Sequence, residues 1–199
     1  MMLIEEATVP DAALPVLEFK AHLRLGTGFS EDSLQDGVLR GFLRAAIAAI
    51  EARTGKVLIE RAYSWSLTRW RDPAGQVLPA APVTGVSALV LLDAQGAETV
   101  VPAGAYRLDR DSERPCLRPV SSQLPMIQTG GSVRIGFTAG LAADWGGLPA
   151  DLGQAVLLLA AHYYEYRHET SLSDGCMPFG VTSLIQRYRP MRIGFGAAQ

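Results

Sequence analysis

Helical periodicity at both ends of the chain and strand periodicity between them most limit its fold. Apolar residues recur at i, i+3 and i+4 over residues 15–25, 31–54 and 149–168, as on one side of an α-helix. From residue 56 to 140, Pro and Gly separate short β-rich runs, which is typical of strands and turns. We therefore predict an α+β protein. Its helical-bundle core, built on helices 31–54 and 149–168, belongs to a domain of residues 1–55 and 141–199, and a small antiparallel β-rich domain of residues 56–140 is inserted.

The long helix predicted over residues 31–54 carries two neighbouring apolar stripes. One apolar stripe, about 100° wide, is enough for a helix on the surface of a globular protein. A second stripe indicates contact with more than one partner, either as a central helix of the fold or as a helix that also forms a subunit interface. The first stripe is Leu34, Val38, Phe42, Ala45 and Ala49. The second stripe is Leu39, Leu43, Ala46, Ile47 and Ile50.

The β-rich part is predicted to form a small antiparallel sandwich or barrel. Strand alternation places Tyr63, Trp65 and Leu67 on one face. The expected strands are Arg61–Trp70, Val86–Leu92, Thr99–Val101, Tyr106–Asp109, Pro115–Arg118 and Ser132–Thr138. A last short helix is expected over Phe179–Tyr188.

Composition excludes several classes of protein. The chain of 199 residues is 48% hydrophobic, which excludes intrinsic disorder for most of it. Its net charge of −2 argues against a general nucleic-acid binder, which usually carries a basic excess. Only 19% of the residues are charged, against about 25% in soluble domains. A subunit that hides surface against copies of itself can manage with so few charges.

Membrane insertion and secretion are not expected. No uncharged apolar run reaches the ~20 residues of a membrane helix, and acids stand near the N-terminus where a signal peptide carries bases. Cys116 and Cys176 are far apart and form no CxxC motif, so a reducing compartment is expected.

The charges are distributed unevenly along the chain. Residues 1–36 contain seven acidic and two basic side chains, whereas residues 179–199 contain Arg187, Arg189 and Arg192 and no acid. Complementary potentials of this kind can orient partners as they associate. The alternative is that both ends are simply solvated.

The sequence contains no assembled catalytic or metal-binding motif. The Gly55–Lys56 pair lacks the Ser or Thr and the preceding glycine of a phosphate-binding loop. His162 and His168 are six residues apart, which places them ~240° apart around a helix, too far for a shared metal. We therefore expect no catalytic residue, no cofactor and no metal.

Two other functions stay open as alternatives. One is a nucleic-acid-binding module that uses Arg69, Trp70 and Arg71, although these residues more simply end a strand. The other is an enzyme of unknown type on the β-rich domain.

Short segments spread over residues 15–190 carry a resemblance by their order, and no single motif is decisive. These segments are Glu18–Arg24, Ala49–Gly55, Leu78–Ser87, the turn ending at Gly96, Val133–Gly140, Leu148–Leu152, Tyr163–Arg167, Pro178–Val181 and Tyr188–Arg189. Their order resembles that of the head–tail connector, or adaptor, family of long-tailed bacteriophages and gene transfer agents.

The resemblance implies a structural protein of a virion or phage-like particle, made in the bacterial cytoplasm and placed at the head–tail junction. It implies a ring of self-associated copies, commonly twelve, beneath the portal protein. A tail-side stopper or tail terminator protein would bind below, and DNA would pass through the channel without sequence recognition. No membrane partner is implied.

The resemblance also implies roles for particular residues. The ring interface would use the first stripe together with two residues of the later helix: Leu34, Val38, Phe42, Ala45, Ala49, Leu159 and Tyr163. Portal docking would use the last helix: Phe179, Arg187, Tyr188 and Arg189. Replacing Ala45 or Ala49 with Glu is expected to prevent ring formation or folding.

Overall fold

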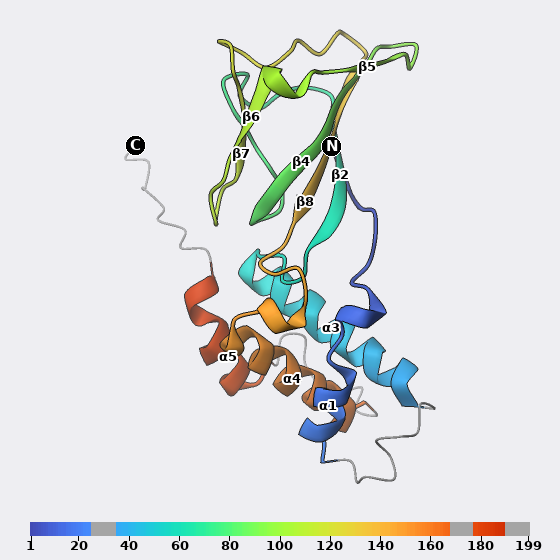
Figure 1. The fold of residues 1–199 in the computed structure, drawn as a ribbon, viewed down its shortest axis with the longest axis vertical. Helices are drawn as coiled ribbons and strands as arrows, with labels where there is room; N and C mark the ends of the chain where they lie inside the picture. The colour runs from blue at the N-terminus through green and yellow to red at the C-terminus, as the bar shows by residue number, and fades with distance from the viewer. Residues whose placement is uncertain (25–34, 168–176, 190–199) are drawn as a thin grey trace, which may run out of the picture. The chain divides into compact units, whose positions relative to one another are not determined.

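A computed structural model describes residues 1–24, 35–167 and 177–189 (Figure 1). It divides into a β-rich unit, Met1–Pro15 with Lys56–Leu148, and a helical unit, Val16–Gly55 with Pro149–Gln199. The strands are β1 (Met2–Glu5), β2 (Arg61–Leu67), β3 (Gln76–Val77), β4 (Val83–Leu92), β5 (Glu98–Val100), β6 (Tyr106–Asp109), β7 (Cys116–Pro119) and β8 (Ser132–Ala139). The α-helices are α1 (Val16–His22), α3 (Asp36–Thr54), α4 (Ala150–Glu165) and α5 (Phe179–Ile185), and α5 continues into the 3-10 turn η5 (Gln186–Tyr188). The predicted α+β class is confirmed.

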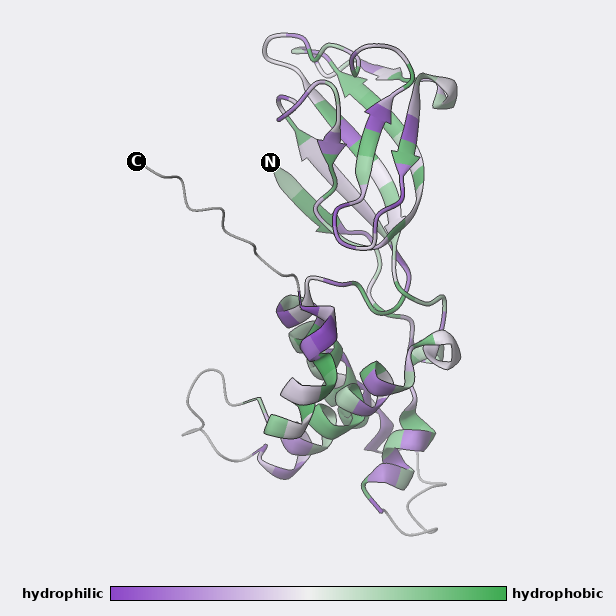
Figure 2. Cartoon of the chain, turned by 90° about the vertical axis from the view of Figure 1, so that its left-hand side faces the viewer, coloured by the Kyte–Doolittle hydropathy of each residue, from purple (hydrophilic) through white to green (hydrophobic). Residues whose placement is uncertain are grey.

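The β-rich unit consists of two antiparallel sheets. The larger has the strand order β1-β2-β8-β4-β5 and the smaller has the order β3-β7-β6. In the larger sheet, Tyr63 of β2 lies opposite Phe137 of β8, and their rings stack with centroids 5.5 Å apart. Figure 2 shows hydrophobic and hydrophilic residues interspersed along these strands, as expected where one face of a sheet is buried.

One hydrophobic cluster joins the two sheets. Tyr63, Trp65 and Leu67 of β2 are buried in it, as the alternation predicted, together with Leu117 of β7 in the smaller sheet. The cluster therefore fills the space between the sheets and holds the unit together.

The domain boundaries differ from the prediction at two places. Residues 1–15 belong to the β-rich unit because β1 pairs with β2, and the N–H of Glu6 donates to the carbonyl oxygen of Ala62 at 3.0 Å. Residues 141–148 belong there as well, since the N–H of Leu141 donates to the carbonyl oxygen of Val57 at 2.9 Å. The prediction had placed both segments with the helices.

In the helical unit, α3 packs against α4, α1 contacts both helices, and α5 packs on α4. α3 begins at Asp36, and the part of the predicted helix over residues 31–34 lies outside the described residues. It ends at Gly55, which adopts the left-handed conformation with φ 69° and donates to the carbonyl oxygen of Glu51 at 2.8 Å. Glycine is the usual residue in this position because it has no Cβ to clash. No helix in the described part of the chain is long and apolar enough to cross a membrane.

Candidate interaction surfaces

The structure assigns different environments to the two apolar stripes of α3. The second stripe is the core of the helical unit: none of its residues, Leu39, Leu43, Ala46, Ile47 and Ile50, is more than 2% exposed. The first stripe is left open, because Val38 is 55% exposed, Ala45 is exposed, and Phe42 and Ala49 are half-buried. Leu34 lies outside the described residues. α3 is thus a core helix that still presents an apolar surface, which we call the α3 outer stripe (Val38, Phe42, Ala45 and Ala49).

An aromatic side chain of α4, that of Tyr164, contacts the α3 outer stripe. The ring of Tyr164 meets the ring of Phe42 edge to face, with centroids 5.9 Å apart. The guanidinium of Arg167 lies 4.5 Å from the centroid of the Tyr164 ring, close enough for a cation–π contact. Tyr163 is half-buried, and this burial raises the pKa of its phenol.

Leu159, predicted at the ring interface, is placed elsewhere by the structure. Its side chain is only 1% exposed and lies in the core of the helical unit. It is covered by its own chain, so direct contact with a neighbouring subunit is not its role. Helical spacing alone could not separate it from Tyr163, one turn further along.

The predicted docking residues of the C-terminal segment fall into two groups. Phe179 is 86% exposed at the start of α5, and Arg189 is exposed directly after η5. Arg187 and Tyr188 instead contact Asp151 in the first turn of α4. The phenol of Tyr188 donates to Oδ1 of Asp151 at 2.8 Å, and Nη2 of Arg187 lies 2.9 Å from Oδ2.

These three side chains form a closed triangle, which we call the Asp151 cluster (Asp151, Arg187 and Tyr188). Nη2 of Arg187 also donates to the phenol oxygen of Tyr188 at 2.5 Å, and its guanidinium lies 4.7 Å from the Tyr188 ring centroid. Desolvation raises the pKa of the Tyr188 phenol; the hydrogen bond from Arg187 opposes this rise, and the hydrogen bond to Asp151 adds to it. Tyr188 lies 37 residues after Asp151, and no local sequence pattern links residues so far apart.

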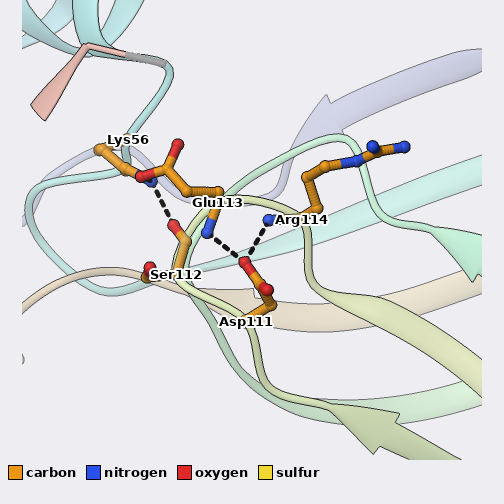
Figure 3. A network of polar contacts seen from close by, with 5 residues as sticks. All are labelled: Lys56, Asp111, Ser112, Glu113 and Arg114. Carbon is orange, nitrogen blue, oxygen red and sulfur yellow. Dashed lines mark hydrogen bonds and ion pairs between the residues drawn. The ribbon is translucent and has the colours of Figure 1, made fainter. Parts of the chain in front are cut away.

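A second polar network ties the β6–β7 loop to Lys56, at the start of the second segment of the β-rich unit (Figure 3). The ammonium of Lys56 donates to the carbonyl oxygen of Ser112 and pairs with the carboxylate of Glu113. Oδ1 of Asp111 accepts from the N–H of Glu113 at 2.7 Å and from that of Arg114 at 2.8 Å. The Lys56 side chain is 5% exposed, so the network holds a buried charge rather than offering one to a ligand.

Two of the residues proposed for the nucleic-acid alternative, Trp70 and Arg71, make hydrogen bonds within the β-rich unit. β2 ends at Leu67, and the indole N–H of Trp70 donates to the carbonyl oxygen of Pro125 at 2.8 Å. The backbone N–H of Arg71 donates to the side chain of Gln76 at 2.9 Å. Trp70 is half-buried and packs against the hydrophobic cluster of the β-rich unit.

Chemical sites are sparse in the described ranges. No group of three or more His, Cys, Asp or Glu side chains within them could hold a metal ion. A hollow of about 230 Å³ lies on the larger sheet and is lined mostly by small residues, Ala62, Ser64, Ser87, Ala88 and Gly136 among them. Glu6, Tyr63, Val90 and Arg134 complete its lining.

Comparison with solved structures decides the family. The chain is 54% identical to a chain in the neck of an empty gene transfer agent particle computed with C6 symmetry, with a TM-score of 0.88 and 100% coverage of both chains. It is also 54% identical to a chain in the virion of a native gene transfer agent particle, with a TM-score of 0.85 and coverage of 98% of this chain and 99% of that one. This protein belongs to the head–tail connector family of long-tailed bacteriophages and gene transfer agents.

A third structure agrees with this assignment. A chain in the neck of a native gene transfer agent particle, computed with C12 symmetry, is 50% identical to this protein with a TM-score of 0.84 and full coverage of both chains. No protein-family model and no curated protein matches the sequence. The predicted family and the predicted location of its members at the head–tail junction of a particle are confirmed.

Proposed function

We propose that this protein is a structural adaptor whose copies form a ring beneath the portal protein, extend the DNA channel and join the head to tail-side proteins. The observation that carries the proposal is the 54% identity over the full length of a chain in a gene transfer agent neck. Necks of such particles were computed with C6 and C12 symmetry, which supports a ring of twelve copies here. The proposed role requires no catalysis and no cofactor.

The α3 outer stripe and Tyr163 are proposed as the ring interface. Val38 is a large apolar side chain that stays 55% exposed, and Phe42 and Ala49 are half-buried beside it. Apolar patches that a folded chain leaves open commonly mark interaction sites. Ala45 and Ala49 have small side chains, so a neighbouring helix could approach closely along this line. The helices α1, α3, α4 and α5 would form the bundle that faces the ring neighbours.

The C-terminal segment Phe179–Arg189 is proposed to dock onto the portal protein. Phe179 offers a large exposed ring, and aromatic anchors are enriched at the centres of interfaces. Arg189 adds an exposed positive charge at the other end of the segment.

DNA is proposed to pass through the ring without being gripped. Both lysines of the sequence, Lys20 and Lys56, are at most 5% exposed, so neither ammonium is available to phosphates. The net charge of −2 likewise provides no excess of cations to hold the backbone. A channel wall with no excess of cations would let DNA pass without binding its phosphates tightly.

Deletion of the gene in the producing bacterium tests the proposal. Without the protein, we expect filled or empty heads and free tails, and a plasmid copy of the wild-type gene should restore joined particles. Electron microscopy of the particles provides the measurement. Joined, transfer-competent particles in the deletion strain would overturn the proposed role.

A further inference from the structure

The contacts of Arg187 and Tyr188 raise a question about how the C-terminal segment works. If these two side chains bind the portal protein directly, they must first leave Asp151. If they stay on Asp151, they act by holding the segment in place. The two possibilities predict opposite effects of removing the Asp151 charge.

We infer that Asp151 is a positioning residue that anchors the C-terminal segment through Arg187 and Tyr188, leaving Phe179 and Arg189 to contact the docking partner. The inference rests on the proposed docking role of the segment. It assigns Arg187 and Tyr188 to the anchor rather than to the interface.

The hydrogen-bonding capacity of the Asp151 carboxylate supports the anchor. Oδ1 accepts from the N–H of Leu152 at 3.0 Å and from the phenol of Tyr188 at 2.8 Å, and Oδ2 pairs with Arg187 at 2.9 Å. Hydrogen bonds that involve an ionised group are stronger than neutral ones. Arg187 and Tyr188 also bind each other, so releasing either one to a partner would disturb the remaining contacts of the cluster.

The segment is held to the helical unit in two separate ways. α5 packs on α4 with Val181 and Ile185 fully buried. Beyond Ile185, the polar contacts of the Asp151 cluster bind η5 to α4. Loss of the Asp151 charge should therefore loosen residues 186–189 while α5 stays packed.

Pre-ordering explains how such an anchor would increase affinity. Binding must immobilise flexible side chains and chain segments, and this ordering opposes association. A segment already fixed on α4 has less freedom to lose. Weakening the anchor should thus weaken docking even though Asp151 itself touches no partner.

The test uses the full chain with D151N, Y188F and the double variant, and E165Q as control. Glu165 is an exposed carboxylate at the end of the same helix α4, so its variant removes a charge of the same sign. Hydrogen exchange and thermal unfolding are measured on the isolated protein. Binding to the purified portal protein of the same particle is measured by biolayer interferometry.

We expect D151N to accelerate exchange at Arg187–Arg189 while the amides of α5 and the melting temperature stay near wild type. Portal affinity should fall roughly tenfold, which corresponds to ordering one or two side chains. D151N and Y188F should be non-additive because they break one cluster. E165Q should change neither measurement.

Portal binding by D151N that equals or exceeds wild type would overturn the inference, since it would mean that freed Arg187 and Tyr188 bind the partner themselves or that the anchor has no role. Unchanged exchange at residues 186–189 would overturn it as well. If the wild-type chain fails to bind the portal protein, the docking role is wrong. Accelerated exchange confined to residues 186–189 in D151N would then still support the anchor.

Discussion

The ammonium nitrogen of Lys20 lies 2.7 Å from Oδ1 of Asp36, which joins α1 to the first turn of α3. The side chain of Lys20 is 5% exposed and that of Asp36 is 20% exposed. Asp36 also gains from the positive end of the α3 dipole, and Arg40 lies 3.9 Å from its other oxygen. The pair is therefore asymmetric in burial, because the lysine side chain is almost fully enclosed whereas the carboxylate keeps some contact with water.

Replacing one or the other partner of this pair should lower the free energy of unfolding by unequal amounts. We expect D36N to lower the free energy of unfolding by about 3 kcal/mol, because it leaves a buried ammonium without this carboxylate. K20M should cost less, since Asp36 keeps Arg40, the helix dipole and some contact with water. Urea unfolding followed by circular dichroism measures both. A larger loss in K20M than in D36N would contradict the asymmetry.

Burial of both lysines predicts an unusual chemical reactivity. The 18 basic residues include only two lysines, Lys20 and Lys56, which are 4% and 5% exposed. An amine-reactive ester should therefore label the native protein at the N-terminal amine and leave both lysines unmodified. Peptide mapping by mass spectrometry locates the label, and the urea-unfolded chain, in which both lysines should react, is the control. Rapid labelling of either lysine in the native protein would show that it is not buried.

Position 140 is predicted to have no room for a side chain larger than that of glycine. A Cβ built there would lie 2.5 Å from the backbone nitrogen of Glu60, which cannot move away without disturbing the chain. G140A should destabilise the β-rich unit by about 2–3 kcal/mol through overpacking. G85A is the matched control, because nothing lies within 4 Å of that added Cβ. Thermal unfolding should show a clear loss for G140A and a change within about 0.5 kcal/mol for G85A; equal effects would contradict the close approach.

Asp111 should make part of the stability depend on acidic pH. Hydrogen bonds from the N–H groups of Arg114 and Glu113 lower the pKa of its carboxyl group. A lowered pKa means that this stabilisation is fully present above the ordinary pKa of an aspartate and is lost as the pH falls through the lowered value. The difference in unfolding free energy between wild type and D111N should therefore be largest near neutral pH and disappear in acid. A difference that stays constant with pH would show that the carboxylate charge is not involved.

The elements that could be predicted from the sequence are those whose own apolar residues alternate, as in a strand, or recur at helical spacing. β6 was expected at Tyr106–Asp109 and has these bounds, and α3 ends at Thr54, the predicted last residue of the helix. β1 was missed because all four of its residues are exposed, so burial left no alternation to detect. This strand is defined by its hydrogen bonds to β2, which lies more than fifty residues later.

The candidate interaction surfaces were only partly predicted, because periodicity shows which residues share a helix face but not which face is buried. Two stripes could be recognised on α3, but only packing shows that Leu43 and Ile47 face the core while Val38 stays exposed. Periodicity placed Leu159 and Tyr163 together, although their burial differs. The contact of Tyr188 with Asp151 joins residues 37 apart, and no periodic pattern encodes a pairing over that distance.

The two faces of α3 provide a matched pair of substitutions for the proposed ring. A45E adds a charge on the exposed face, so the chain should fold with a near-normal melting temperature and fail to assemble. A46E adds the same charge at a position that is 0% exposed, where an unpaired charge should prevent folding. Circular dichroism separates the two effects. Unfolding by A45E, or normal assembly with it, would contradict the assignment of the α3 outer stripe to the ring interface.

Cryo-electron microscopy of the protein bound to its purified portal protein tests the central proposal most directly. Images computed without imposed symmetry should show one closed ring of twelve copies on the portal, with the α3 outer stripe buried between neighbours. The A45E variant, folded but unable to pack, should give portals without the ring. Wild-type protein that binds the portal as scattered single copies, or not at all, would contradict the account.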